Sequence, residues 1–445
     1  MKCSVSYRLR IVVGAANDFV TTVSVFRDAV DFLIGVVEKE WDCFRDCINA
    51  DAAVVIAERL THKTANRLIV KYDFDALFYK FPSYLRRSAI AKAFGLVSSY
   101  HSNLDKWLCA DHKTRGRRPS VPKAGHSFPV LYKDNMFVSG ENCTARIKVF
   151  RNNTWDWAEV RLRKSDVDYV RRRCGDCKAS SPSLVRRGKV WSLDIAYTVN
   201  KELNNIPIRK QRIVSVDLGV NNACVCSVML PDGTVVGRRF LRLSAENDSL
   251  ERALGRIRKA QRLNARRTPR LWARADGINK DIASKTAGFI ADTAMMYNAD
   301  VIVMEGLDAV GKKRGSKRQR LHLWKVKAVQ AMVEGKAHRL GMRLSRVCAW
   351  NTSRLAFDGS GEVKRGKDSE KTGGNYSLCE FPNGKVYHCD LSASYNIGAR
   401  YFIRELLKSV TATRRLQLEA KVPSVCRRST CTLSDLISLD AALSA

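Results

Sequence analysis

The sequence predicts a multidomain α+β protein: an α/β domain fills the second half of the chain, and a β-barrel interrupted by a helical domain precedes it. Two observations predict this arrangement. At 445 residues, the chain is too long for one ordinary domain. The spacing of its apolar residues also changes, from alternation to a helical period, back to short strands, and finally to strands that alternate with helices.

Charge is the strongest signal in the composition. The chain holds 78 lysines and arginines against 44 aspartates and glutamates, a net charge of +34. Nucleic acid is the expected partner, since the basic residues are spread over the whole length and do not gather on one membrane-binding helix. No run of 18 apolar residues occurs, so we expect no transmembrane helix. The 14 cysteines are scattered, which is typical of free thiols in a reducing compartment.

The first half predicts a barrel with an insertion. An alternating strand within residues 1–17 and a series of short strands within residues 127–205 form the barrel, and residues 18–126 form the helical domain. A basic, Gly- and Pro-containing arm closes the helical domain. We expect three of its side chains to bind nucleic acid: Arg115, Arg117 and Arg118.

A strongly basic helix lies in the second half. Leu250, Leu254 and Ile257 give it an apolar face, and Pro269 is expected to end it. So many cations on one helix repel each other unless an anion pairs with them, so we expect nucleic acid to bind there. The candidate contacts are Arg252, Arg256, Lys259, Arg262 and Arg266.

Three acids stand at the ends of predicted elements. Asp217 and Glu305 each end a buried strand before a glycine, and Asp390 lies in the first turn of a helix. Alone, each is more often a turn or cap residue. Together they suit phosphodiester hydrolysis with two Mg²⁺ ions about 4 Å apart, because carboxylates are ligands of Mg²⁺. This is the ribonuclease H layout, and the order Asp, Glu, Asp is that of its RuvC branch.

The motifs around these acids resemble a known family. Residues 216–222, 303–307 and 390–398, together with residues 351–354, are similar to the RuvC motifs of compact type V CRISPR effector nucleases and of the related TnpB proteins. The resemblance implies an RNA-guided, Mg²⁺-dependent DNA endonuclease with a single RuvC-like site, in the cytoplasm of a prokaryote. Guide RNA and a double-stranded DNA target would be its partners, and a short flanking duplex motif would be read by the first half.

The resemblance also implies further organisation and one further contact. Residues 206–420 would form the nuclease domain, residues 349–389 a degenerate zinc-ribbon-like insertion in it, and residues 421–445 a flexible tail. Arg354 would contact the scissile phosphate. Residues 355–359 replace the first cysteine pair of the ribbon and Pro382 replaces one cysteine of the second, so we expect no zinc. A non-standard site of Cys348, Cys379, His388 and Cys389 stays open.

Other functions remain open on these residues. Ser392 stands where the family often has asparagine, which raises doubt about the cleavage rate. Because the zinc ribbon near the acids is degenerate, the chain could also be an RNA-guided DNA-binding protein that represses or recruits without cutting. A transposon-associated, TnpB-like nuclease is a further alternative, and an unguided resolvase or transposase is another. We also leave open whether two copies form a homodimer on one guide.

Overall fold

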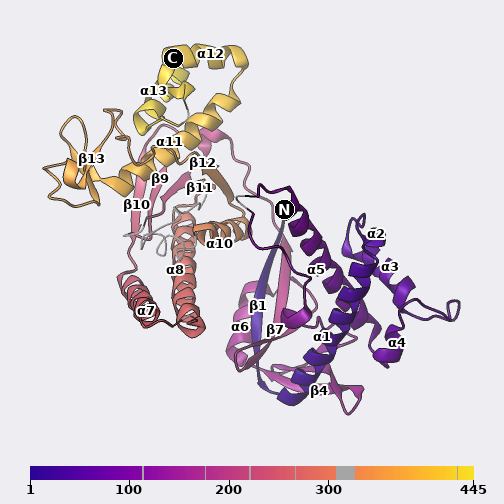
Figure 1. Ribbon diagram of the computed structural model, residues 1–445. Coiled ribbons are helices and arrows are strands. Elements are labelled where there is room, and N and C mark those ends of the chain that lie inside the picture. Colours follow the sequence, from indigo (N-terminus) through magenta and orange to yellow (C-terminus); the bar gives the residue numbers. More distant parts are fainter. Residues whose placement is uncertain (113–114, 176, 220–221, 266, 307–325, 428) are drawn as a thin grey trace. The chain divides into compact units, whose positions relative to one another are not determined.

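The computed structural model describes residues 1–112, 115–175, 177–219, 222–265, 267–306, 326–427 and 429–445 (Figure 1). The chain divides into two compact units. The N-terminal unit is Ser4–Val199, and the C-terminal unit is Asn200–Ala445 with Met1–Cys3. Both contain helices and strands, so the predicted multidomain α+β class is confirmed.

The N-terminal unit is built on a seven-stranded sheet. Its strands follow the order β2-β3-β4-β1-β7-β5, with β6 also paired to β7, so the first strand lies inside the sheet as expected. The pairs β1–β4, β2–β3, β3–β4, β5–β7 and β6–β7 are antiparallel. Closure of this sheet into a barrel remains a prediction. The strands are β1 (Lys2–Val13), β2 (Phe137–Ser139), β3 (Thr144–Arg151), β4 (Thr154–Leu162), β5 (Lys178–Ala179), β6 (Ser183–Arg187) and β7 (Val190–Asn200).

Two long helices organise the rest of this unit. α1 packs against both α5 and strand β3 (Figure 1). It buries Phe19, Phe26, Val30 and Leu33, which recur every three to seven residues along one face of the helix. The helices are α1 (Ala16–Lys39), α2 (Trp41–Phe44), α3 (Ala50–Thr61), α4 (Phe74–Leu77), α5 (Ser83–Cys109) and α6 (Lys164–Cys174).

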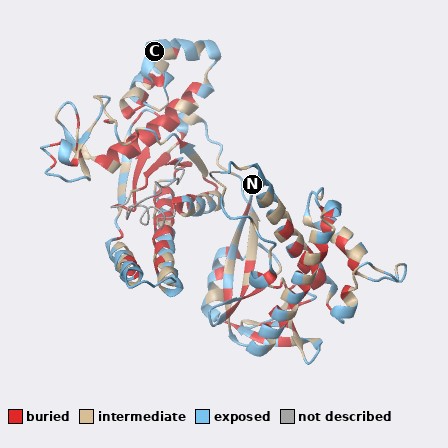
Figure 2. Ribbon diagram, viewed as in Figure 1, coloured by how far each residue is buried: buried red, intermediate tan, exposed pale blue. Residues whose placement is uncertain are grey.

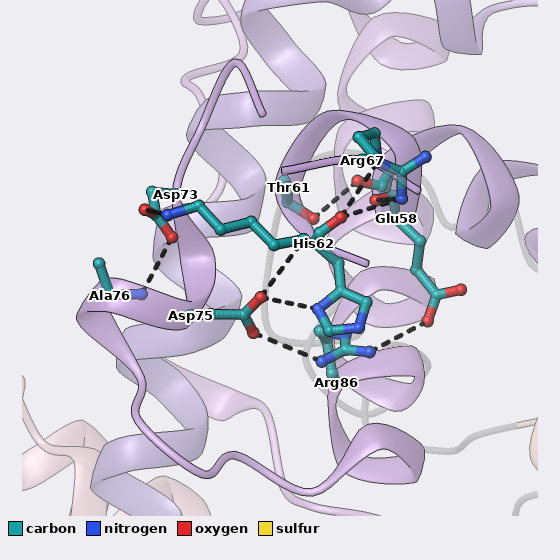
Figure 3. A network of polar contacts seen from close by, with 10 residues as sticks. Glu58, Thr61, His62, Arg67, Asp73, Asp75, Ala76 and Arg86 are labelled. Carbon is teal, nitrogen blue, oxygen red and sulfur yellow. Dashed lines mark hydrogen bonds and ion pairs between the residues drawn. The ribbon is translucent and has the colours of Figure 1, made fainter. Parts of the chain in front are cut away.

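A buried arginine joins three of these helices (Figure 3). Arg86 on α5 is 5% exposed, and its two terminal nitrogens each lie 3.6 Å from a carboxylate, Glu58 on α3 and Asp75 on α4. The second oxygen of Asp75 lies 2.7 Å from Nδ1 of His62. Arg67 then donates to the carbonyl oxygens of Glu58 and His62, both at 2.9 Å. These contacts fix both ends of the loop between α3 and α4.

Replacing Arg86 tests this network. Arg86→Met leaves two partly exposed carboxylates without their shared cation, which should lower the free energy of unfolding by about 2 kcal/mol. Amide hydrogen exchange in α3 and α5 should therefore become roughly 30-fold faster. The matched control is Arg87→Met, because Arg87 lies 3.3 Å from the same Glu58 carboxylate but is exposed. It should change stability by no more than about 0.5 kcal/mol. Equal effects of the two variants would contradict the buttressing role of Arg86.

The C-terminal unit is built on a five-stranded sheet with the order β10-β9-β8-β11-β12. The strands β8, β11 and β12 run parallel, while β9 is antiparallel to β8 and to β10. Strands β8, β9 and β11 are buried along their whole length, as the continuous apolar runs predict (Figure 2). The strands are β8 (Ile213–Asp217), β9 (Cys224–Met229), β10 (Val235–Leu241), β11 (Val301–Glu305) and β12 (Arg343–Val347).

Helices pack on both faces of this sheet. Val214, Val216 and their neighbours pack against α8 (Pro269–Met296) and α10 (Val326–Arg339), and α7 (Ser244–Arg262) packs on α8. The opposite face carries α11 (Cys389–Ser409). A Cβ atom at Gly398 would lie 2.3 Å from Sδ of Met229, so this glycine allows α11 its close approach to the sheet. Pro269, expected to end the basic helix, instead opens α8, since α7 already ends at Arg262.

The insertion between β12 and α11 has a small core of its own. Strands β13 (Lys364–Arg365), β14 (Leu378–Glu380) and β15 (Val386–His388) form an antiparallel sheet. The buried apolar residues of this core are Ala356, Cys379, Phe381 and Cys389. The predicted insertion at residues 349–389 therefore contains a small three-stranded sheet.

The end of the chain differs from the expected flexible tail over residues 421–445. α12 (Ala412–Lys421) is followed by η4 (Pro423–Cys426) and α13 (Leu433–Ser444). α13 begins with a capping box of Thr432 and Asp435 and packs on α11. It buries Leu433, Leu436 and Leu439, and this helical spacing explains why residues 433–444 form a packed helix. No helix among the described residues is long and apolar enough to cross a membrane.

Candidate active site

Two of the three predicted acids come from adjacent strands. β8 and β11 run parallel with Val216 opposite Met304, so the next residues, Asp217 and Glu305, lie at the same end of the sheet. They are 9% and 8% exposed, respectively. Gln330 on α10 fixes the end of β11, because its side-chain amide donates to the carbonyl oxygen of Glu305 at 2.8 Å.

The third acid reaches the same place from the other face of the sheet. Asp390 lies in the first turn of α11, which packs on β8 and β9. A Cβ atom at Gly219, two residues after Asp217, would lie 3.6 Å from Oδ2 of Asp390. The structure thus brings Asp217, Glu305 and Asp390 together at one end of the sheet.

Burial raises the pKa values of Asp217 and Glu305, and neighbouring negative charges raise that of Asp217 further. The pKa of Asp217 is raised well above its ordinary value, first by burial and then by the negative charges of Glu305 and Asp390. Burial also raises the pKa of Glu305, against the opposing effects of its hydrogen bond from Thr352 and the charge of Arg400. Close, buried carboxylates cost free energy when ionised, so a bound cation would stabilise them.

The segment after β12 holds Glu305 in position. The hydroxyl of Thr352 donates to the carboxylate of Glu305. Helix α11 in turn holds this segment: Asn396 donates to the carbonyl oxygen of Thr352 at 3.0 Å, and Arg400 donates to that of Trp350 at 2.7 Å. Sequence patterns alone assign no role to Asn396 or Arg400. Their burial in α11, on the helix that carries Asp390, is the signal that identifies them.

Asn222 is the main site residue that sequence reasoning missed. It is 2% exposed, and its side-chain amide donates to Oδ2 of Asp390 at 2.7 Å. Nε of Arg242 donates to its amide oxygen at 3.1 Å, which orients the group. The hydroxyl of Ser392 is buried and makes no hydrogen bond with any described residue. Asn222 supplies the polar support at Asp390 that Ser392 does not.

The basic helix α7 presents its predicted contacts to solvent. Ala253, Leu254 and Ile257 face the core. Arg252 donates to the hydroxyl of Ser249 at 3.1 Å. Three of the other predicted contacts form no ion pair with any described residue, so their positive charge is uncompensated. The fourth, Arg266, lies outside the described residues. The three exposed side chains are Arg256, Lys259 and Arg262.

The arm after α5 uses one of its arginines to close the helix. Arg115 donates to the carbonyl oxygens of Leu108 and Ala110, at 2.7 and 3.0 Å, and its guanidinium carbon lies 4.6 Å from the centre of the Trp107 ring. Arg117 and Arg118 are exposed. Arg115 therefore has a structural role that its prediction as a nucleic-acid contact did not include.

Arg354 lies on the surface and pairs with a nearby acid. Its side chain is 65% exposed and lies 3.0 Å from the carboxylate of Glu362. Its predicted contact with a phosphate stays a prediction.

The cysteines form no disulfide, and two of them contact each other near Asp390. All 14 are thiols, as the sequence predicts. The thiols of Cys379 and Cys389 affect each other: the neighbouring Cys389 lowers the pKa of Cys379, and Cys379 raises that of Cys389. The described residues contain no group of three or more His, Cys, Asp or Glu side chains arranged to hold a metal ion as they stand.

Comparison with known proteins adds two relationships. Residues 4–151 match the model of the Aq_aa04 family, a match that lies within the N-terminal unit. Over 239 residues, the chain is 28% identical to the TnpB-like protein aq_aa05 of Aquifex aeolicus (strain VF5), covering 48% of this chain and 76% of that protein. The predicted resemblance to TnpB-like proteins is thereby confirmed.

Two solved structures are also similar. One is a Cas12f1–sgRNA–target DNA complex, 15% identical, with 88% of this chain and 98% of that chain covered and a TM-score of 0.34. The other is Alicyclobacillus acidoterrestris C2c1 with single-guide RNA, 11% identical, with 86% and 66% covered and a TM-score of 0.46. Both TM-scores lie below 0.5, so neither likeness determines the fold or function of this chain.

The electrostatics of Asp217 can be tested without nucleic acid. Its pKa is raised on folding, so its contribution to stability is greatest below the ordinary value of about 3.9 and is lost as the pH rises through the folded value. With a metal chelator present at pH 7, Asp217→Asn should therefore unfold at a higher temperature than the parent. The expected increase is about 2–4 °C for each kcal/mol of unfavourable free energy that the substitution removes.

The difference between Asp217→Asn and the parent should shrink as the pH falls towards 4. Asp232→Asn, a change in the exposed turn between β9 and β10, is the control and should show no such trend. A parent protein as stable as Asp217→Asn at pH 7 would contradict the repulsion among the three acids.

Proposed function

We propose that this chain is an RNA-guided DNA endonuclease with a single RuvC-like site, in which Asp217, Glu305 and Asp390 are the catalytic residues. The observation that carries the proposal is their convergence at one end of a sheet whose three parallel strands are flanked by an antiparallel hairpin. That topology and the order Asp, Glu, Asp support a ribonuclease H-like domain. The net charge of +34 and the TnpB-like relative support nucleic acid as substrate and guide.

The donor chemistry of the site fits Mg²⁺. Its side chains are carboxylates, and the pKa of Asp217 is raised first by burial and then by the negative charges of Glu305 and Asp390. A closed cage of protein ligands is not required, because Mg²⁺ is usually held by one or two carboxylates, with water and substrate phosphate as its other ligands. Bound at Asp217, Glu305 and Asp390, two such ions would neutralise charge on the attacking and leaving oxygens.

The hydrogen bonds around Asp390 and Glu305 leave one carboxylate oxygen of each free to bind a cation. Asn222 occupies Oδ2 of Asp390, and Thr352 occupies one oxygen of Glu305. No hydrogen bond from a described residue reaches the second oxygen of either carboxylate, so each has one oxygen free to bind a cation. Placement on β8, β11 and α11 holds the three groups fixed, and burial strengthens their interaction with charge.

The N-terminal unit would hold the guide and the target. We propose that the predicted barrel (residues 1–17 and 127–205) and the predicted helical domain (residues 18–126) bind guide RNA and the duplex beside the target, while base pairing selects the sequence. The uncompensated cations of α7 would bind the phosphate backbone near the nuclease site. A homodimer on one guide remains compatible with this proposal.

A second candidate is an RNA-guided DNA-binding protein that does not cut. The observation that favours it is the unpartnered hydroxyl of Ser392, two residues after Asp390. A transposon-associated, TnpB-like nuclease would use the same site and differ in the origin of its guide, and the relative from Aquifex favours this version. Sequencing the RNA that co-purifies with the protein distinguishes a repeat-derived guide from a transposon-end RNA.

Cleavage by an Asp217 variant tests the proposed reaction. Asp217→Ala should reduce Mg²⁺-dependent plasmid cleavage at least about 1,000-fold, or ~4 kcal/mol of transition-state stabilisation, and leave RNA binding within about 2-fold of the parent. Asp232→Ala should cleave like the parent. Cleavage by Asp217→Ala at the parent rate would exclude the assignment, and a parent that binds RNA and target without cutting would favour the second candidate.

A variant of Asn222 tests how Asp390 is positioned. Asn222→Ala removes the amide that orients Asp390, so the Mg²⁺ concentration for half-maximal cleavage should rise by about 10- to 100-fold. Excess Mg²⁺ should restore part of the rate, which a general folding defect would not allow. Asn247→Ala, on α7, is the matched control. An unchanged Mg²⁺ requirement in Asn222→Ala would mean that this hydrogen bond has no part in metal binding.

A further inference from the structure

The N-terminal unit contains a cavity that none of the proposed functions uses. It has a volume of about 550 Å³, within the range of small-molecule sites. It lies between α1, the short helix η1 (Ala124–His126) and the hairpin of β6 and β7. Five of its lining residues carry the chemistry: Arg27, Asp28, Phe128, Arg186 and Trp191.

Two arginines are fixed in its wall. Nε of Arg27 donates to the carbonyl oxygen of Ser127 at 3.0 Å, and its guanidinium carbon lies 5.0 Å from the centre of the Phe128 ring. Arg186 repeats this arrangement: Nε donates to the carbonyl oxygen of Gly188 at 3.1 Å, and the guanidinium carbon lies 5.6 Å from the centre of the Trp191 ring.

Both guanidinium groups keep their charge available for an anion. In the described part of the chain, neither arginine forms an ion pair, and no hydrogen bond involves their terminal nitrogens. A guanidinium held through Nε presents those nitrogens in a fixed fork, which matches the oxygens of a phosphate. Two such groups on one cavity therefore indicate an anionic ligand.

The other residues of the cavity wall favour a ligand that carries an aromatic base over a simple anion such as phosphate. Trp191 is 8% exposed and is held edge-on against Phe19, with ring centres 5.4 Å apart, so it forms a rigid aromatic wall. Aromatic rings and guanidinium planes are the surfaces on which unpaired bases stack. Asp28 is exposed at the cavity, makes no ion pair with a described residue, and would repel an acidic peptide. Its carboxylate can accept hydrogen bonds from base N–H groups.

We propose that this cavity binds one unstacked nucleotide of the RNA that the protein carries, with its phosphate at Arg27 and Arg186 and its base against Trp191. The adjacent N1–H and N2–H donors of guanine match a single carboxylate, so Asp28 gives the cavity a preference for guanine. The RNA partner rests on the proposed function, whereas the nucleotide chemistry rests on the cavity itself. The site would thereby read one base of the RNA by protein contacts, independently of base pairing.

Direct titration tests the cavity. Nucleic-acid-free protein is titrated with 5′-GMP, 5′-AMP and inorganic phosphate and followed by ligand-detected NMR. GMP should bind the parent more tightly than AMP or phosphate, and Arg186→Glu should weaken it at least about 10-fold. Lys189→Glu, in the same hairpin but outside the cavity wall, should bind like the parent. Asp28→Asn should remove the preference of GMP over AMP. Equal binding of phosphate and GMP, or GMP binding unaffected by Arg186→Glu, would overturn the proposal.

Crosslinking tests the RNA origin of the nucleotide. Ultraviolet irradiation of the RNA-loaded protein should give nucleotide adducts on peptides that contain Phe128 or Trp191, with guanine enriched and with a marked loss in Arg186→Glu. Adducts that form on these peptides only after DNA is added would overturn the assignment to RNA. GMP binding in a protein without RNA-dependent cleavage would instead contradict the proposed function and leave the cavity proposal standing.

Discussion

The parallel pairing of β8 with β11 is the constraint on which the candidate site depends. Because Val216 lies opposite Met304, the chain places Asp217 and Glu305 side by side with almost no exposure to water. Burial and the negative charges of Glu305 and Asp390 together raise the pKa of Asp217, so the ionised acids are costly at this position. A protein gains nothing in stability from such an arrangement, so a cation-dependent function explains it better than a structural role does.

Helix α11 links the rest of the C-terminal unit to that pair of strands. Gly398 lets it approach the sheet closely, and its first turn supplies Asp390. Asn396 and Arg400 hold the segment that carries Thr352, which in turn donates to Glu305. The sequence predicted a flexible tail at the end of the chain, but α13 packs on the same helix, α11, and supports it. One helix thus positions one acid directly and a second acid through its neighbours.

Sequence patterns predicted the elements of the site but not the contacts between them. The apolar runs that end in Asp217 and Glu305 identified two buried strands, because their signal is local. The hydrogen bond from Asn222 to Asp390 joins residues 168 positions apart, and no local spacing encodes it. The role of Arg115 could not be predicted from its charge either. The charge suggested contact with nucleic acid, whereas in the structure the side chain donates a hydrogen bond to a carbonyl oxygen at the end of α5. The domain boundaries and the phosphate contact of Arg354 remain predictions.

Binding of Mn²⁺, a paramagnetic substitute for Mg²⁺, tests the central claim most directly. Electron paramagnetic resonance of the nucleic-acid-loaded protein should show Mn²⁺ bound to the parent and lost when Asp217, Glu305 and Asp390 are each replaced by the corresponding amide, with RNA still bound. If the triple variant bound Mn²⁺ as the parent does, the three converging acids would not form the metal site, and the C-terminal unit would have to hold its cation elsewhere or act without one.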